Sequence, residues 1–123
     1  MTQESIKNQV KEKYGNIALS GNSDCCCMPQ ECCGVATTTR EASITIVYDA
    51  RDLESVPSES ILGVGCGAPL NFADLKQSET VVDLGSGAGI DSFLASKQVN
   101  NSGRVIGIDF TDEMLPILLG LTL

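Results

Sequence analysis

The side chains best suited to chemistry in this sequence are its cysteines. Five of them fall within nine residues, Cys25, Cys26, Cys27, Cys32 and Cys33. Adjacent cysteines cannot easily bond each other, and the N-terminus shows no apolar signal-peptide core, so a secreted disulfide framework is disfavoured. With no histidine in the chain and no clear Cys-x-x-Cys pair, a finger-type zinc site is also weak. Two interpretations stay open: soft thiolate chemistry toward a soft metal or metalloid, and a flexible loop.

A sixth cysteine, Cys66, lies in a second unusual stretch, Leu62-Gly63-Val64-Gly65-Cys66-Gly67-Ala68-Pro69. Three glycines around one thiol suggest a backbone that must approach another group closely, with the thiol exposed on a mobile loop. A small residue packed in an ordinary turn is the alternative.

A glycine motif offers a different chemistry. Asp83 is followed by Gly85, Gly87 and Gly89, a tight turn that leaves room for an extended polar ligand at a helix N-terminus. The dinucleotide pattern Gly-x-Gly-x-x-Gly fails because its last position is Ile90. The motif instead resembles the first motif of class I S-adenosylmethionine-dependent methyltransferases, which implies that Asp83 lies near the ammonium and methionine part of the cofactor.

A second carboxylate supports this interpretation. The apolar run Arg104–Ile108 leads to Asp109, twenty residues beyond Gly89. A carboxylate at the end of a second strand can accept hydrogen bonds from both hydroxyls of a ribose.

The spacing of apolar residues predicts the strands and helices that must position these groups. Val81–Leu84 and Arg104–Ile108 predict two buried parallel strands, joined through the glycine turn and a helix, and hence an α/β fold. The stripe Ile6, Val10 and Tyr14 predicts a helix over Gln3–Tyr14 that ends at Gly15. Ile44–Tyr48 fits either a short strand or a helical turn, and Asp49–Val56 predicts a surface helical turn followed by a loop.

Composition excludes several classes of partner. The net charge is −8, without a basic patch to neutralise phosphates, so nucleic acid is excluded as a partner. No run of about 18 apolar residues predicts a membrane span, and the lack of a leader predicts a cytoplasmic protein.

Taken together, the motifs resemble those of arsenite methyltransferases, from near residue 10 to Leu115. The glycine motif alone would fit any class I methyltransferase, whereas the cysteine cluster and the Gly-Cys-Gly loop select the arsenic branch. The segments that carry the resemblance occur in the family's order: Lys13-Tyr14-Gly15, the cysteine cluster, Asp52–Pro57, Leu62–Pro69, Asp83–Gly89 and Gly107–Leu115.

The resemblance implies a substrate, a cofactor and a set of site residues. Trivalent arsenic is thiophilic, so thiolates can take it from a thiol conjugate and hold its lone pair toward the methyl group of S-adenosylmethionine. A thiol reductant, glutathione or thioredoxin, would serve the accompanying disulfide cycle. Cys66 matches the family's loop cysteine, and one member of the cluster matches its N-terminal thiol. The implied catalytic residues are Cys66, Cys26 and Cys27, the arsenic relay is Cys25, Cys26, Cys27, Cys32, Cys33 and Cys66, and the cofactor-binding residues are Asp83, Gly85, Ser86, Gly87, Gly89, Asp109, Phe110, Thr111 and Met114.

The end of the sequence departs from the family's pattern. Relatives continue with a charged amphipathic helix, whereas Pro116–Leu123 is apolar and broken by Pro116 and Gly120, as after a truncation or a shifted reading frame. We therefore expect a partial Rossmann-like sheet, with a helical and cysteine-rich segment over residues 1–60 and the start of a methyltransferase domain over 61–123. Alone, this chain is expected to be marginally stable and inactive.

Two other functions compete with this interpretation. One is a class I methyltransferase for a small organic acceptor or quinone precursor, in which the cysteines are incidental. The other is a cysteine-rich module that binds a soft metal or metalloid.

Overall fold

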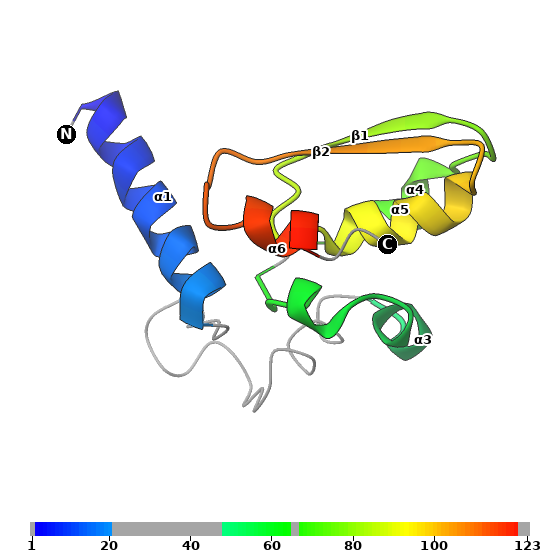
Figure 1. Ribbon diagram of the computed structural model, residues 1–123. Coiled ribbons are helices and arrows are strands. Elements are labelled where there is room, and N and C mark those ends of the chain that lie inside the picture. Colours follow the sequence, from blue (N-terminus) through cyan, green and yellow to red (C-terminus); the bar gives the residue numbers. More distant parts are fainter. Residues whose placement is uncertain (1, 21–47, 65–66, 121–123) are drawn as a thin grey trace.

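Two parallel strands and the helix between them form the centre of the fold. The computed structural model describes residues 2–20, 48–64 and 67–120. Strand β1 (Thr80–Leu84) pairs with β2 (Arg104–Ile108) in register from Thr80 opposite Arg104 to Leu84 opposite Ile108. Helix α5 (Ile90–Val99) connects them and lies along one face of the sheet (Figure 1). The predicted strands and their parallel pairing are confirmed.

The glycine turn after β1 needs backbone angles that other residues rarely adopt. Gly85, Gly87 and Gly89 have φ values of 75°, 54° and 94°, all left-handed. The N–H groups of Gly85 and Ser86 both donate to the carbonyl of Ile108, at 2.7 and 3.0 Å. The turn is thereby fixed to the end of β2, and Gly89 caps the start of α5.

The apolar runs predicted buried strands, but the strands are not buried on both faces. Val81 and Asp83 lie on the face toward α5 and are half-buried, while the alternate residues point away. Four of these alternate residues are apolar and keep 41–78% of their surface exposed: Val82, Leu84, Ile106 and Ile108. In the described part of the chain, only one face of the sheet is therefore well covered.

Helix α1 (Gln3–Ser20) is longer than predicted, because Gly15 does not end it. Ile17, beyond the glycine, is buried in a cluster with Leu62, Ala88 and Met114. Gly15 itself is buried against Glu113, so its missing side chain serves close packing. Tertiary contact thus overrides the local stop signal.

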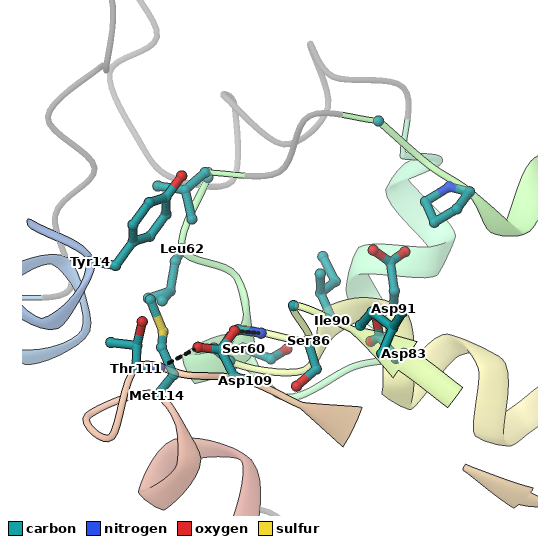
Figure 2. A pocket seen from close by; sticks show the side chains of 18 of the residues that line it. Tyr14, Ser60, Leu62, Asp83, Ser86, Ile90, Asp91, Asp109, Thr111 and Met114 are labelled. Carbon is teal, nitrogen blue, oxygen red and sulfur yellow. Dashed lines mark hydrogen bonds between the residues drawn. The ribbon is translucent and has the colours of Figure 1, made fainter. Parts of the chain in front are cut away.

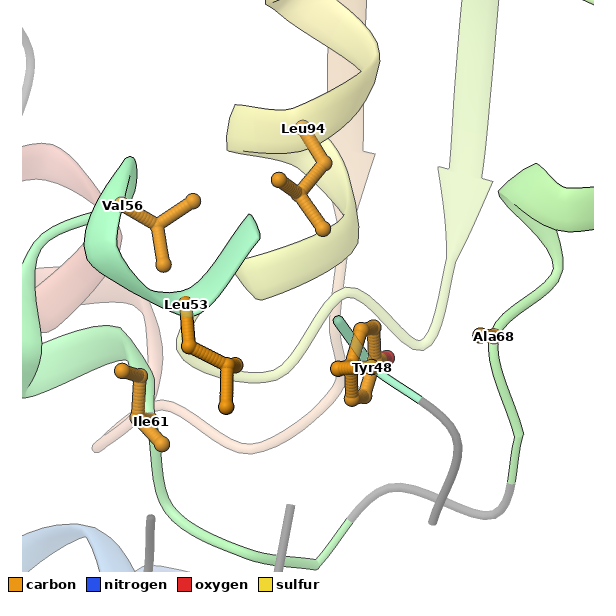
Figure 3. Packing of buried hydrophobic residues seen from close by; sticks show 6 residues of the cluster. All are labelled: Tyr48, Leu53, Val56, Ile61, Ala68 and Leu94. Atoms are coloured by element: carbon orange, nitrogen blue, oxygen red, sulfur yellow. The ribbon is translucent and has the colours of Figure 1, made fainter. Parts of the chain in front are cut away.

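A second cluster lies beneath the N-terminal half of α5 (Figure 3). It is built around helix α3 (Ala50–Glu54) and the short 3₁₀ helix η1 (Ser58–Ser60), with helix α4 (Leu70–Ala73) nearby. Helix α3 is the predicted helical turn, although its Leu53 is only 1% exposed. Of the run Ile44–Tyr48, only Tyr48 lies within the described residues. The cluster comprises Tyr48, Leu53, Val56, Ile61, Ala68 and Leu94.

Helix α6 (Leu115–Gly120) corrects the prediction that Pro116 breaks the apolar tail. Proline lacks a backbone N–H, but the first turn of a helix has no intrahelical acceptor for that group. Pro116 is the second residue of α6 and therefore fits its first turn, while Gly120 is its last residue.

Candidate functional site

A cavity of about 440 Å³ opens at the carboxyl ends of β1 and β2. This is the edge at which parallel sheets of this kind bind their ligands, and the volume is in the usual range for small-molecule sites. Walls come from the glycine turn, the segment after β2, the loop after η1 and the last part of α1 (Figure 2). The residues that carry its polar or aromatic character include Tyr14, Tyr48, Ser60, Asp83, Ser86, Asp91, Asp109, Phe110 and Thr111.

Asp109 is held rigidly at one wall of the cavity. Its Oδ2 accepts a hydrogen bond of 2.9 Å from the Gly87 N–H, and its Oδ1 accepts one of 2.8 Å from the Thr111 N–H. Each carboxylate oxygen has a second lone pair, so the group can still accept hydrogen bonds from a ligand. Next to it, Thr111 and Met114 are buried and Phe110 is exposed.

Two more carboxylates lie together at another part of the cavity (Figure 2). Oδ2 of Asp83 accepts a 2.7 Å hydrogen bond from the Ser92 hydroxyl. The Tyr48 hydroxyl lies 3.1 Å from both carboxylate oxygens of Asp91. Burial raises the pKa of Asp91, the hydrogen bond from Tyr48 lowers it, and the negative charge of Asp83 raises it further, with a net upward shift.

The glycine turn also has features that suit a ligand. The Ser86 hydroxyl oxygen is buried and has no hydrogen-bond partner within the described structure, an arrangement that normally costs stability. Side chains added at Gly85 or Gly87 would meet open space among the described residues, so their positive φ values alone demand glycine there.

Most of the predicted cofactor residues line this cavity. Gly89 is the exception, since it caps α5 and is not part of the wall. All six cysteines lie outside the described residues, so the predicted arsenic relay has no structural description. The residues that do line the cavity are Asp83, Gly85, Ser86, Gly87, Asp109, Phe110, Thr111 and Met114.

Several residues of the site were not predicted from the sequence. Asp91 carried the clearest signal, as an acidic residue in the first turn of the helix after the glycine turn. Tyr14 and Tyr48 come from segments distant in sequence and only the fold brings them to the cavity. In the sequence, Tyr14 belongs to a helical stripe and Tyr48 to a short apolar run.

Two features are absent from the described residues. No group of three or more metal-ligating side chains is present among them. None of the helices described is both long and apolar enough to cross a membrane.

Comparison with known proteins shows similarity to methyltransferases. Residues 75–117 match the family model described as a methyltransferase domain. Over 91% of its length the chain is 44% identical to an arsenite methyltransferase of Halobacterium salinarum, and over 93% it is 29% identical to the arsenite methyltransferase of Mus musculus. A shorter match, 35% identity over 39% of the chain, relates it to the chloroplastic 2-phytyl-1,4-beta-naphthoquinone methyltransferase of Arabidopsis thaliana, of which it covers 18%.

The chain spans only part of these relatives. The matched segment is 30% of the halobacterial protein and 28% of the mouse protein. No solved structure gave a significant match. The resemblance to arsenite methyltransferases that the motifs predicted is confirmed by the two long matches.

Proposed function

We propose that the cavity of this chain binds S-adenosylmethionine and that its cysteines hold trivalent arsenic as the methyl acceptor. The match of residues 75–117 to a methyltransferase domain supports the choice of cofactor. The observation that carries the proposal is the cavity at the ends of β1 and β2, in which the glycine turn and Asp109 are bonded together. The similarity to arsenite methyltransferases over nine-tenths of the chain supports the choice of acceptor.

The polar groups of the cavity suit the parts of this cofactor. Asp109 would accept hydrogen bonds from the ribose hydroxyls, as carboxylates at the end of a second strand do in related folds. Asp83 would face the ammonium group, and the buried Ser86 hydroxyl would gain a polar partner. The glycine turn leaves the backbone accessible to the molecule between these groups.

The cysteines would supply the arsenic site. Thiolates exchange onto trivalent arsenic, which is soft and thiophilic, so Cys66 and one or more of Cys25, Cys26, Cys27, Cys32 and Cys33 would take it from a thiol conjugate. The arsenic lone pair then forms a bond to the methyl carbon as the bond from that carbon to sulfur breaks, which leaves S-adenosylhomocysteine. Alignment of the two groups is the main requirement, and a general base is not needed.

This chemistry also indicates a reductant and a cell compartment. Arsenic is formally oxidised by the methyl transfer, so a dithiol or glutathione-type reductant must return it to the trivalent state before another round. Reduced thiols are maintained in the cytoplasm, which is where we propose that the protein acts.

Cofactor binding is the first experiment. Isothermal titration of S-adenosylmethionine into the 123-residue chain should give saturable binding, and Asp109→Ala should weaken it at least about tenfold, because two backbone donors and the ribose lose their acceptor. Lys76→Ala, at an exposed site in the segment before β1, is the matched control. A wild-type chain that shows no binding at millimolar ligand refutes the proposal.

The acceptor needs a separate experiment. Arsenite binding is measured by titration under reducing conditions, with Cys66→Ser compared with the wild-type chain. Weaker arsenite binding with unchanged S-adenosylmethionine binding supports the arsenic site, and equal arsenite binding contradicts the role of Cys66.

A second candidate acceptor is a quinone precursor, favoured by the match to the naphthoquinone methyltransferase. In that case the cysteines are incidental, so Cys66→Ser would leave the methylation of an organic acceptor unchanged.

A further inference from the structure

Two carboxylates lie together in one part of the cavity, and the packing of the fold does not require both of them. Asp83 comes from β1 and Asp91 from the first turn of α5, and both side chains line the cavity (Figure 2). Oδ2 of Asp83 accepts from Ser92 and the carboxylate of Asp91 accepts from Tyr48, so both groups are oriented by neutral donors. Among the described residues, no hydrogen bond or ion pair joins either carboxylate to a cationic side chain.

A purely structural role for Asp91 explains only part of this arrangement. An acidic residue in the first turn favours a helix, and the bond from Tyr48 ties the chain before α3 to α5. However, partial burial and the nearby charge of Asp83 both disfavour the ionised form of Asp91. Two like charges at one half-buried place are costly unless a cation joins them.

A separate observation points to a ligand at this cavity. Ser86 also lines the cavity, is 7% exposed, and its hydroxyl oxygen is buried without a hydrogen-bond partner among the described residues. Buried hydroxyls are nearly always satisfied in native proteins. The cavity thus has both an unmatched pair of negative charges and an unmatched polar group, as expected for a site built to receive a charged polar molecule.

We propose that Asp91, held in place by the Tyr48 hydroxyl, is a second carboxylate that binds the ammonium group at the amino-acid end of the ligand, together with Asp83. This inference rests on the proposed function. An ammonium group has three N–H donors and can bond to two carboxylates at once, whereas a sulfonium has no such donor. Tyr48 is then a positioning residue, since its hydroxyl contacts Asp91.

Three ligands separate this proposal from its alternatives. S-adenosylmethionine and S-adenosylhomocysteine share the ammonium group, but only the first has a charged sulfur, and 5′-methylthioadenosine lacks the amino-acid end. Asp91→Asn should weaken the binding of the first two ligands by equal factors, about 10- to 100-fold, because a charge-assisted hydrogen bond is lost. Binding of 5′-methylthioadenosine should stay within about twofold. Tyr48→Phe should give a smaller loss with the same selectivity.

Asp74→Asn is the matched control, since it makes the same change of charge at an exposed site whose positive φ suits asparagine. It should leave the binding of all three ligands unchanged.

Each other outcome contradicts the proposal. A loss for S-adenosylmethionine alone assigns Asp91 to the sulfonium, an equal loss for all three ligands shows a general distortion of the cavity, and no loss shows that Asp91 makes no contact. A wild-type chain that binds none of the three refutes the proposed function and this inference with it. Binding of the wild type that is unaffected by Asp91→Asn refutes this inference alone.

Discussion

The backbone N–H of Gly87 donates a 2.9 Å hydrogen bond to Oδ2 of Asp109, which joins the glycine turn to the end of the second strand. The other oxygen of the same carboxylate accepts from the Thr111 N–H. One side chain therefore joins the glycine turn to the segment after β2, and both of these segments line the cavity. The ligand is expected to meet a preformed surface, which reduces the entropy that binding must overcome.

Replacement of Asp109 tests this relationship. Asp109→Asn keeps one acceptor and Asp109→Ala keeps none, so the affinity for 5′-methylthioadenosine, a nucleoside ligand, should fall in that order. Loss of hydrogen bonds to a charged acceptor is worth about 1.5–3 kcal/mol each, so we expect at least a tenfold loss for alanine. Titration calorimetry gives the affinities, and hydrogen exchange at Gly87 should become faster in Asp109→Ala, which leaves its N–H without this acceptor. Equal affinities for the three proteins would show that Asp109 does not hold the ligand-binding surface.

The sequence predicted this part of the fold because the signals are local. Glycine spacing gives the turn, and β-branched runs give the strands that lead to Asp83 and Asp109. The burial of the strands was less predictable, because an apolar run has the same sequence pattern whether one face of the sheet or both faces are covered. Val82 and Ile108 illustrate this, since they belong to apolar strands and are still 52% and 50% exposed.

Asp91 should behave as a residue retained for binding at the expense of stability. Its pKa in the folded chain is raised, so the fold favours the protonated form. For such a group the stabilising contribution is complete below the unfolded pKa of about 3.9 and is lost as the pH rises through the folded value. At neutral pH the charged group therefore destabilises the fold, and Asp91→Asn should leave the free energy of unfolding unchanged or increase it.

Urea denaturation at about pH 7 and about pH 4 provides the measurement, because any stability gain should shrink as wild-type Asp91 becomes protonated. Tyr48 can still donate to the asparagine oxygen, so that contact is preserved. Asp74→Asn again controls for net charge. A clear loss of stability at neutral pH in Asp91→Asn would instead indicate a mainly structural carboxylate.

Helix α1 shows why long-range packing escapes a sequence argument. Gly15 is a usual helix stop, yet the helix continues because Ile17 finds a buried position against Leu62 and Met114. Nothing local to residues 15–20 identifies these partners, which are more than forty residues away. Tyr14 reaches the cavity wall through the same packing.

The attachment of α1 should depend on Ile17 far more than on its surface ion pair. Ile17 is 5% exposed, and removing its buried side chain in Ile17→Ala should cost about 2–4 kcal/mol. Lys11 and Asp112 form a 2.6 Å ion pair whose side chains are 38% and 77% exposed, so solvent screens the pair and Lys11→Ala should cost much less stability than Ile17→Ala. Urea denaturation measures both. A larger loss for Lys11→Ala than for Ile17→Ala would mean that charge holds this helix.

Gly103, in the turn from α5 into β2, should tolerate no side chain. A Cβ atom there would lie 2.8 Å from the Glu79 carbonyl oxygen and would also collide with the side chain of Val99, which is 1% exposed. The same Glu79 carbonyl accepts from the Arg104 N–H at 3.0 Å, so it cannot move without loss of a bond at the start of the strand pair. Gly103→Ala should therefore reduce the free energy of unfolding by about 1–3 kcal/mol.

Asn101→Ala, two residues earlier at an exposed position, is the control and should change the free energy of unfolding by less than about 0.5 kcal/mol. Equal stability of the two variants would show that the turn can move away from the sheet, and that the start of β2 is less firmly held than its packing indicates.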